Sequence, residues 1–213
     1  MVCEPMLPPC RDDSGLEEPL ELGTLPNGLA WEGEIAYLDR DGVLNRGSPD
    51  YINHPDEVSL LPGAAKAMAE LRRSGFRICV VTNQSPIGRG LWDHNRLGEI
   101  HERLRELLLV EDSDAVIDLL LYSPYAPWEG SWARKPNPGM LEAGRQLLQS
   151  SHDKSGPIEI YFGEDWSERP SESGSVLVGD RDSDISAGHS HGVRSLLCNP
   201  EAGLSEVLEQ IIG

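Results

Sequence analysis

The sequence has no surplus of basic residues. Its 213 residues include 18 lysines and arginines against 36 aspartates and glutamates, which gives a formal net charge of −18. A surface this acidic repels both phosphate backbones and anionic lipids, so we expect neither a general nucleic-acid binder nor a membrane-docking protein. High solubility is the simplest consequence of the same composition.

Long apolar runs and closely spaced cysteines are also missing. No window reaches the roughly 20 apolar residues that span a bilayer, and the first residues lack the basic region of a signal peptide. None of the four cysteines, Cys3, Cys10, Cys79 and Cys198, belongs to a C-x-x-C pair. We therefore expect free thiols in a reducing compartment and a cytoplasmic location.

The length and the apolar content of 38% suit one domain with a core. Residues 1–30 are expected to form a flexible tail, because prolines interrupt any helix and acidic side chains dominate, although its leucines could dock on the domain. Residues 31–213 are expected to form the domain itself. Within it, residues 150–174 form a polar insertion whose apolar island, 158–162, would allow a hairpin.

Short apolar runs alternate with helical patterns through this domain. Strands are predicted at 35–38, 77–81, 116–122, 175–179 and 193–197, and helices after residues 63, 93 and 137, before residue 191 and at 204–212. Such alternation is typical of an α/β fold in which helices cover both faces of a parallel sheet.

Two carboxylates, Asp39 and Asp41, follow the first apolar run directly. In an open α/β sheet, ligands bind just beyond the carboxyl ends of the strands. Side chains at positions i and i+2 of an extended chain point the same way, so both carboxylates can face one site. Because like charges this close repel, the pair predicts a hard divalent cation with oxygen ligands.

Three further polar clusters stand at strand ends or before a helix: Thr82-Asn83-Gln84-Ser85, Arg134-Lys135 and Asp180 to Asp184. Each cluster alone would suit a capped turn or a solvated charge pair. Together they supply carboxylates, a hydroxyl, an amide and two cations at one edge of a parallel sheet. This set can move a phosphoryl group, because a metal and a lysine neutralise its oxygens while a carboxylate attacks phosphorus.

The ordered set resembles the haloacid dehalogenase (HAD) superfamily of phosphatases. The matching pieces are D-x-D-G at 39–42, the strand-terminal Thr82, Lys135 and G-D-x-x-x-D at 179–184. The longer pattern, with D-R-D-G-V-L-N at 39–45, T-N-Q-S at 82–85 and R-K-P at 134–136, is similar to the heptose bisphosphate and histidinol phosphate phosphatases. The resemblance implies a Rossmann-like, three-layer HAD fold and Mg²⁺-dependent hydrolysis of a phosphomonoester.

The resemblance also implies a role for each matching residue. Asp39 would be the nucleophile that forms an aspartyl-phosphate, and Asp41 the acid that protonates the leaving oxygen and then the base that activates water. Mg²⁺ would be held by Asp39, the backbone carbonyl of Asp41 and Asp180, while Asp184 would contact these ligands or a metal-bound water. Thr82 and Lys135 would bind the phosphoryl oxygens. The candidates for binding the rest of the substrate are Asn83, Gln84, Ser85, Arg134 and Arg181.

The sequence departs from the family pattern in one loop. Heptose bisphosphate phosphatases carry zinc ligands of the form C-x-H and C-x-C before the Arg-Lys-Pro, and these positions hold Ser123, Tyr125, Ser131 and Ala133 here. No soft ligand remains, so we expect no zinc and a loop held by Tyr125, Trp128 and Trp132. No insert is long enough for a cap domain, so we expect a minimal cap and an open site covered only by the loops 46–56, 86–91 and 123–133.

Three functions fit these observations. The first is a Mg²⁺-dependent phosphatase of a small metabolite, such as a heptose bisphosphate or histidinol phosphate. The second is a phosphatase of nucleic-acid ends, which the acidic charge disfavours. The third is a non-catalytic domain that binds Mg²⁺ or phosphate, which the retention of every catalytic residue type disfavours. His189 and His191 lack partners at ligand spacing and are expected to be surface or packing residues.

Overall fold

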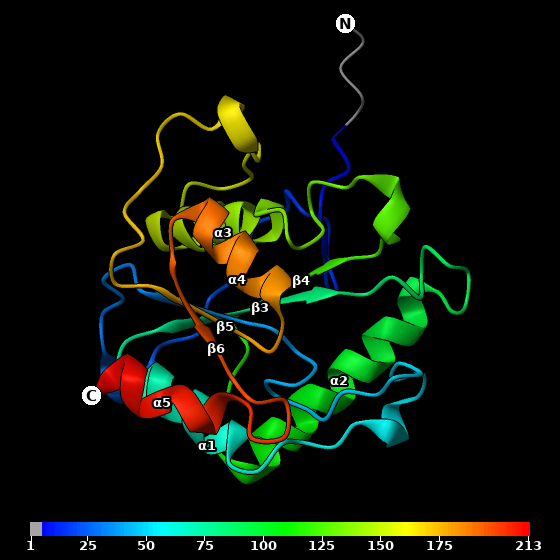
Figure 1. The fold of residues 1–213 in the computed structure, drawn as a ribbon. Helices are drawn as coiled ribbons and strands as arrows, with labels where there is room; N and C mark the ends of the chain where they lie inside the picture. Colours follow the sequence, from blue (N-terminus) through cyan, green and yellow to red (C-terminus); the bar gives the residue numbers. More distant parts are fainter. Residues whose placement is uncertain (1–5) are drawn as a thin grey trace, which may run out of the picture.

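The computed structural model describes residues 6–213, which form a six-stranded sheet between two helical layers (Figure 1). The strand order is β1-β4-β3-β2-β5-β6. The parallel strands are β2 (Ile35–Leu38), β3 (Arg77–Asn83), β4 (Leu119–Ser123), β5 (Val176–Gly179) and β6 (Arg194–Leu197), and β1 (Cys10–Arg11) pairs with β4 in the antiparallel sense. The predicted α/β fold with a parallel sheet is thus confirmed, with one strand added at its edge.

Figure 1 shows α1 (Ala64–Arg73), α2 (His94–Glu111) and α5 (Leu204–Ile212) on one face of the sheet, and α3 (Gly139–Asp153) and α4 (Asp182–His191) on the other. Four single turns of 3₁₀ helix complete the elements: Pro26–Gly28, Pro55–Glu57, Pro127–Glu129 and Gly163–Asp165. All of these helices cover the sheet or connect its strands, and within residues 6–213 no separate cap domain is present. None of them combines the length and the hydropathy of a membrane span.

The central strand β2 is buried along its whole length between β3 and β5. Ala36 and Leu38 point into the core shared with α1 and α2, whereas Ile35 and Tyr37 point into the core shared with α3. Burial on both faces explains why these strands read as continuous apolar runs. The connections from β2 to β4 run over one face and those from β4 to β6 over the other, so the chain reverses its winding between β2 and β5, where ligands bind in such sheets.

The amino-terminal segment differs from the expected flexible tail. Residues 10 and 11 pair with β4, Asp12 forms a hydrogen bond with His101 and an ion pair with Arg105, and Leu25 is only 2% exposed. The prolines break helices but are compatible with the extended strand and turns of this segment. A few buried side chains supply contacts that the overall composition does not predict. The expectation for residues 1–5, including Cys3, lies outside the described part of the chain.

The polar insertion also differs from its prediction, because no hairpin forms at 158–162. Helix α3 extends to Asp153, and the chain then crosses the outer face of α3 in irregular structure apart from one 3₁₀ turn. Glu172 anchors the end of this segment by accepting hydrogen bonds from Arg145 and from the Tyr37 hydroxyl, and His191 contacts the same carboxylate. As expected, His191 is therefore a packing residue and His189 is exposed. Cys10, Cys79 and Cys198 are free thiols.

Candidate active site

The carboxyl ends of β2, β3 and β5 and the residues before α3 enclose a small cavity of about 30 Å³. Its lining consists of Asp39, Asp41, Thr82, Asn83, Lys135, Arg181, Ser183 and Asp184. These residues come from four separate stretches of the chain and meet at the reversal point between β2 and β5. Wider surface grooves, such as one of about 710 Å³ beside α2, lack this combination of carboxylates and a buried lysine.

The ammonium of Lys135 lies between two carboxylates of the cavity. It lies 2.9 Å from Asp39 Oδ1 and 2.6 Å from Asp184 Oδ1, and it donates a hydrogen bond of 2.7 Å to the Val81 carbonyl. Burial works against its charge, but the two carboxylates outweigh burial and raise the pKa of Lys135 above its usual range. The lysine is therefore a fixed positive charge at the bottom of the site.

Burial also raises the pKa of Asp39 well above the usual range of a carboxyl group, with Lys135 opposing the shift and Asp184 adding to it. Too many carboxylates share this site for one lysine to keep all of them ionised. The site consequently favours additional positive charge close to Asp39. A bound cation would supply it and leave this carboxylate ionised.

The side chain of Asp41 points toward Arg40 rather than into the carboxylate cluster. Arg40 Nε and Nη2 donate to its two oxygens at 3.1 and 2.8 Å, and Asn45 donates at 2.8 Å. Burial would raise the pKa of Asp41, but the charge and hydrogen bonds of Arg40 and Asn45 outweigh it and lower that pKa. The sequence assigned no role to Arg40 or Asn45. Both residues lie in or next to the D-x-D-G motif in the sequence, but residue spacing does not show which way the turn directs their side chains.

The polar residues at the end of β3, 82–85, contribute to the site partly through hydrogen bonds that fix other residues. The Asn83 amide accepts from the Lys135 backbone N–H at 3.1 Å and donates to its carbonyl at 3.0 Å, so it fixes the residue that carries the ammonium. Gln84 donates to Thr82 Oγ1 at 2.8 Å. Thr82 and Asn83 line the cavity, whereas Gln84 and Ser85 are buried and do not line it.

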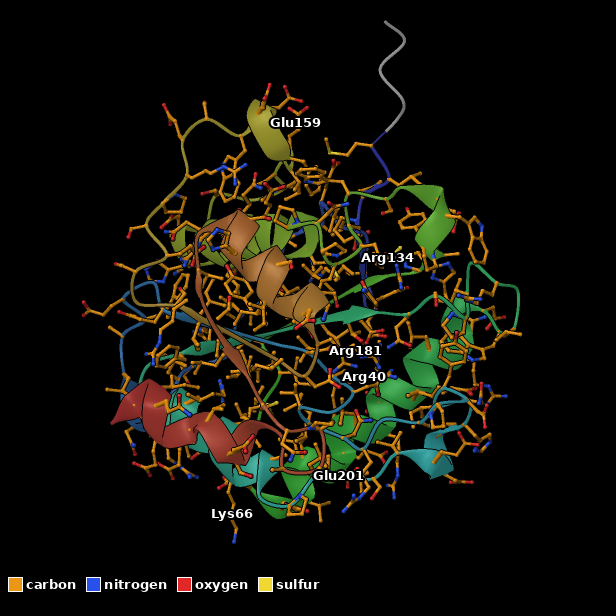
Figure 2. All side chains as sticks on the ribbon, viewed as in Figure 1. Arg40, Lys66, Arg134, Glu159, Arg181 and Glu201 are labelled. Atoms are coloured by element: carbon orange, nitrogen blue, oxygen red, sulfur yellow. The ribbon has the colours of Figure 1, made fainter. Side chains whose placement is uncertain are left out.

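The two predicted arginines occupy different positions. Arg181 is exposed and lines the cavity, and Arg134 is half-buried outside the lining, with its guanidinium donating to the Tyr125 carbonyl at 3.1 Å. Figure 2 shows both near the same end of the sheet as Arg40. Trp128 and Trp132 were both expected to hold the loop 123–133. Trp132 donates a hydrogen bond to Glu142, whereas Trp128 is 70% exposed.

Three carboxylates, Asp39, Asp180 and Asp184, present oxygen atoms that all lie within 4.8 Å of one another. Asp180 Oδ1 is buried and accepts no hydrogen bond from any residue in 6–213. Gly42, with φ of 78°, makes room for it, since a Cβ at this position would lie 2.5 Å from Asp180 Oδ2. The Arg181 Nε lies 3.6 Å from Asp180 Oδ1, which is too far for a hydrogen bond. An all-oxygen donor set with a buried oxygen that accepts no hydrogen bond fits a hard divalent cation such as Mg²⁺. Compared with the predicted side-chain ligands Asp39 and Asp180, the group also includes Asp184.

Known proteins are similar to this chain in sequence and in fold. The D-glycero-D-manno-heptose-1,7-bisphosphate 7-phosphatase of Thermosynechococcus vestitus is 32% identical over 185 residues, which cover 81% of this chain and 82% of the relative. The chain belongs to the heptose bisphosphate phosphatase family of HAD hydrolases. The family model described as HAD-hydrolase-like matches residues 132–209. These findings confirm the family that the motifs indicated.

Other members of the heptose bisphosphate phosphatase family match a shorter stretch. The D-glycero-beta-D-manno-heptose-1,7-bisphosphate 7-phosphatase of Pseudomonas aeruginosa is 44% identical over 107 residues, or 50% of this chain, and the chain spans 59% of that relative's length.

Among solved structures, the D,D-heptose 1,7-bisphosphate phosphatase of B. bronchiseptica, in complex with magnesium and phosphate, is 25% identical with a TM-score of 0.64 and covers 83% of this chain and 99% of its own. A putative HAD-like phosphatase from Mesorhizobium loti has 27% identity and a TM-score of 0.61, covering 94% of this chain and 91% of its own.

Proposed function

We propose that this protein is a Mg²⁺-dependent phosphomonoesterase that hydrolyses a small phosphorylated metabolite through an aspartyl-phosphate. The observation that carries the proposal is the meeting of Asp39, Lys135 and Asp184 around one small cavity, with Asp180 beside them. Family membership supports it, because the relatives are named phosphatases and the B. bronchiseptica enzyme was crystallised with magnesium and phosphate.

In this proposal, the Asp39 carboxylate attacks phosphorus, and the bond from phosphorus to the leaving oxygen breaks. Lys135 and Thr82 hold the phosphoryl oxygens as charge shifts onto them, which is an electrostatic contribution of about 3 kcal/mol for a single such contact. Asp41 protonates the leaving oxygen. It then removes a proton from the water that hydrolyses the aspartyl-phosphate. The contacts from Arg40 that lower the pKa of Asp41 favour its ionised form, which this second step needs, and work against the protonated form that the first step needs.

Asp39, Asp180 and the carbonyl of Asp41 would hold Mg²⁺, with Asp184 beside them. When bound, the ion supplies the positive charge that keeps Asp39 ionised and neutralises phosphoryl oxygens. The remaining residues of this chain keep their own tasks. Lys135 orients the phosphoryl group from the side of Asp184, and Asn83 fixes the backbone of Lys135.

The substrate we favour is a sugar phosphate such as a heptose bisphosphate, with histidinol phosphate as the nearest alternative. The support is the family, together with the predicted substrate-binding residues Arg134 and Arg181, which lie near the end of the sheet that carries the cavity. A cytoplasmic location fits the free, buried thiols of Cys79 and Cys198.

Hydrolysis of p-nitrophenyl phosphate with and without Mg²⁺ tests the reaction. We expect turnover that requires the metal and disappears in Asp39→Asn, whose side chain is nearly isosteric. A panel of sugar phosphates, histidinol phosphate, nucleotides and phosphorylated oligonucleotide ends then tests the substrate class. No turnover of any compound by the wild-type protein across several divalent metals would contradict the proposal.

A further inference from the structure

The loop that precedes Lys135 has to place its ammonium accurately. Lys135 Nζ lies within 3 Å of both Asp39 and Asp184, so a shift of the backbone by an ångström would break at least one contact. The loop positions Ser123, Tyr125, Ser131 and Ala133 offer no soft ligand with which a metal could hold the loop. Other contacts must therefore fix it.

One such contact is a fully buried carboxylate, Glu142, on the first turns of α3. Its Oε2 accepts a hydrogen bond of 2.7 Å from the Trp132 indole N–H. Its Oε1 accepts one of 2.7 Å from Arg169, and the backbone N–H of Gly163 donates to the same carboxylate at 3.2 Å. Hydrogen bonds to a charged, buried acceptor are roughly twice as strong as neutral ones. Glu142 thus joins the loop before Lys135 to the segment 163–169.

The same loop is tied on its other side to the amino-terminal segment. Ser131 Oγ and the Ala133 N–H both donate to the Leu7 carbonyl, at 3.0 and 3.3 Å. Asn137 also donates to the Ser131 carbonyl at 2.9 Å. At the start of α3 the fit is close, since a Cβ on Gly139 would lie 2.5 Å from the Trp132 carbonyl oxygen. Residues 131–133 are therefore held by contacts with Glu142, with the Leu7 carbonyl and with the start of α3, directly before the cationic Arg134 and Lys135.

We propose that Glu142 and Trp132 form a positioning pair for Lys135. The hydrogen bond from the indole to the buried carboxylate fixes residues 131–134, and through them the ammonium that faces Asp39 and Asp184. The catalytic part of this inference rests on the proposed phosphatase function, whereas the fixing of the loop does not. Neither side chain lines the cavity, so both act only through Lys135.

Trp132→Phe tests the pair, because it removes the indole N–H and keeps an aromatic ring. Trp31→Phe is the matched control. The Trp31 indole N–H also donates a hydrogen bond of 2.7 Å, to the Glu34 carbonyl, but beside the amino-terminal end of β2, away from the cavity. Both variants are compared with the wild type by kcat and KM for p-nitrophenyl phosphate, by hydrogen exchange of the amides of residues 131–135, and by urea unfolding.

We expect Trp132→Phe to lower kcat about 10- to 100-fold, the range that a misplacement of roughly an ångström produces. Exchange at residues 131–135 should become faster in this variant, while Trp31→Phe should leave both quantities at the wild-type level. A folded Trp132→Phe protein with wild-type kcat and wild-type exchange would overturn the proposal. If the wild type turns over none of the phosphorylated compounds with any of the divalent metals, the proposed function fails, and the exchange comparison alone decides whether the pair fixes the loop.

Arg169→Gln is the second variant, in case Trp132→Phe does not fold. The Arg169 side chain is 33% exposed, so its replacement leaves no internal cavity. It removes the ionic partner that holds the buried Glu142 from the far side, at a cost in stability that urea unfolding measures. We expect a smaller loss of kcat, about two- to tenfold, and faster exchange at residues 131–135. Wild-type values of both would overturn the proposal.

Discussion

Replacing Lys135 by methionine removes the one charge around which the carboxylates are arranged. The side chains have similar length, but the variant leaves Asp39 and Asp184 buried without the ammonium that lies 2.9 and 2.6 Å from them. Breaking a buried ion pair by removing one partner costs about 3–5 kcal/mol of stability. The loss of one contact to the phosphoryl oxygens should raise the barrier by about 3 kcal/mol, or roughly a hundredfold in rate.

Urea unfolding and p-nitrophenyl phosphate turnover measure these two effects. We expect Mg²⁺ to recover part of the lost stability of Lys135→Met, because a cation among Asp39, Asp180 and Asp184 restores positive charge to the same carboxylates. Lys66→Met is the matched control, since Lys66 is exposed on α1 and lies far from the site in Figure 2. A Lys135→Met protein that keeps wild-type stability and more than half of the wild-type rate would refute the assignment of Lys135 as the central charge of the site.

Three further predictions follow from the same structure. Asp39→Asn should abolish turnover and leave the circular dichroism spectrum unchanged; retained activity would argue against an aspartyl-phosphate. Asp180→Ala should raise the Mg²⁺ concentration needed for half-maximal rate at least tenfold, and an unchanged metal titration would contradict its role as a ligand. Burial lowers the pKa of His101 to about 4. The unfolded chain, with a histidine pKa of about 6.5, then binds the proton first, so stability is full above pH 6.5 and should fall by roughly 2–3 kcal/mol toward pH 4.5. Urea unfolding at the two pH values, with His101→Gln as the comparison, checks this, and an equal fall in both proteins would rule out His101 as the cause.

The motifs could be interpreted from the sequence because each depends on local order. An apolar run that ends in Asp39 and Asp41 specifies a buried strand and the polar groups at its end, whatever the rest of the chain does. The same holds for Thr82 after β3 and for Asp180 after β5. The parallel sheet then brings these ends together, so that their meeting at one edge of the sheet follows from topology.

The amino-terminal segment and the insertion could not be predicted in this way. Their composition is that of a chain that buries little, yet Leu25 lies in the core and Glu172 accepts hydrogen bonds from Arg145 and Tyr37. Local patterns average over a segment, whereas a few buried contacts with distant residues are enough to order it. No spacing rule relates Glu172 to its partners, which lie 27 and 135 residues away.

The sequence by itself determined the family, the parallel sheet and which residue types stand at the strand ends, because these depend on short patterns and on the order of strands and helices. Only the tertiary structure decided how the charges are shared. It turns the Asp41 carboxylate toward Arg40, adds Asp184 to the group formed by Asp39 and Asp180, and makes Glu142 a buried acceptor for Trp132. The strength of a charge depends on its burial and on its nearest partners, and both are fixed only when segments far apart in the chain pack together.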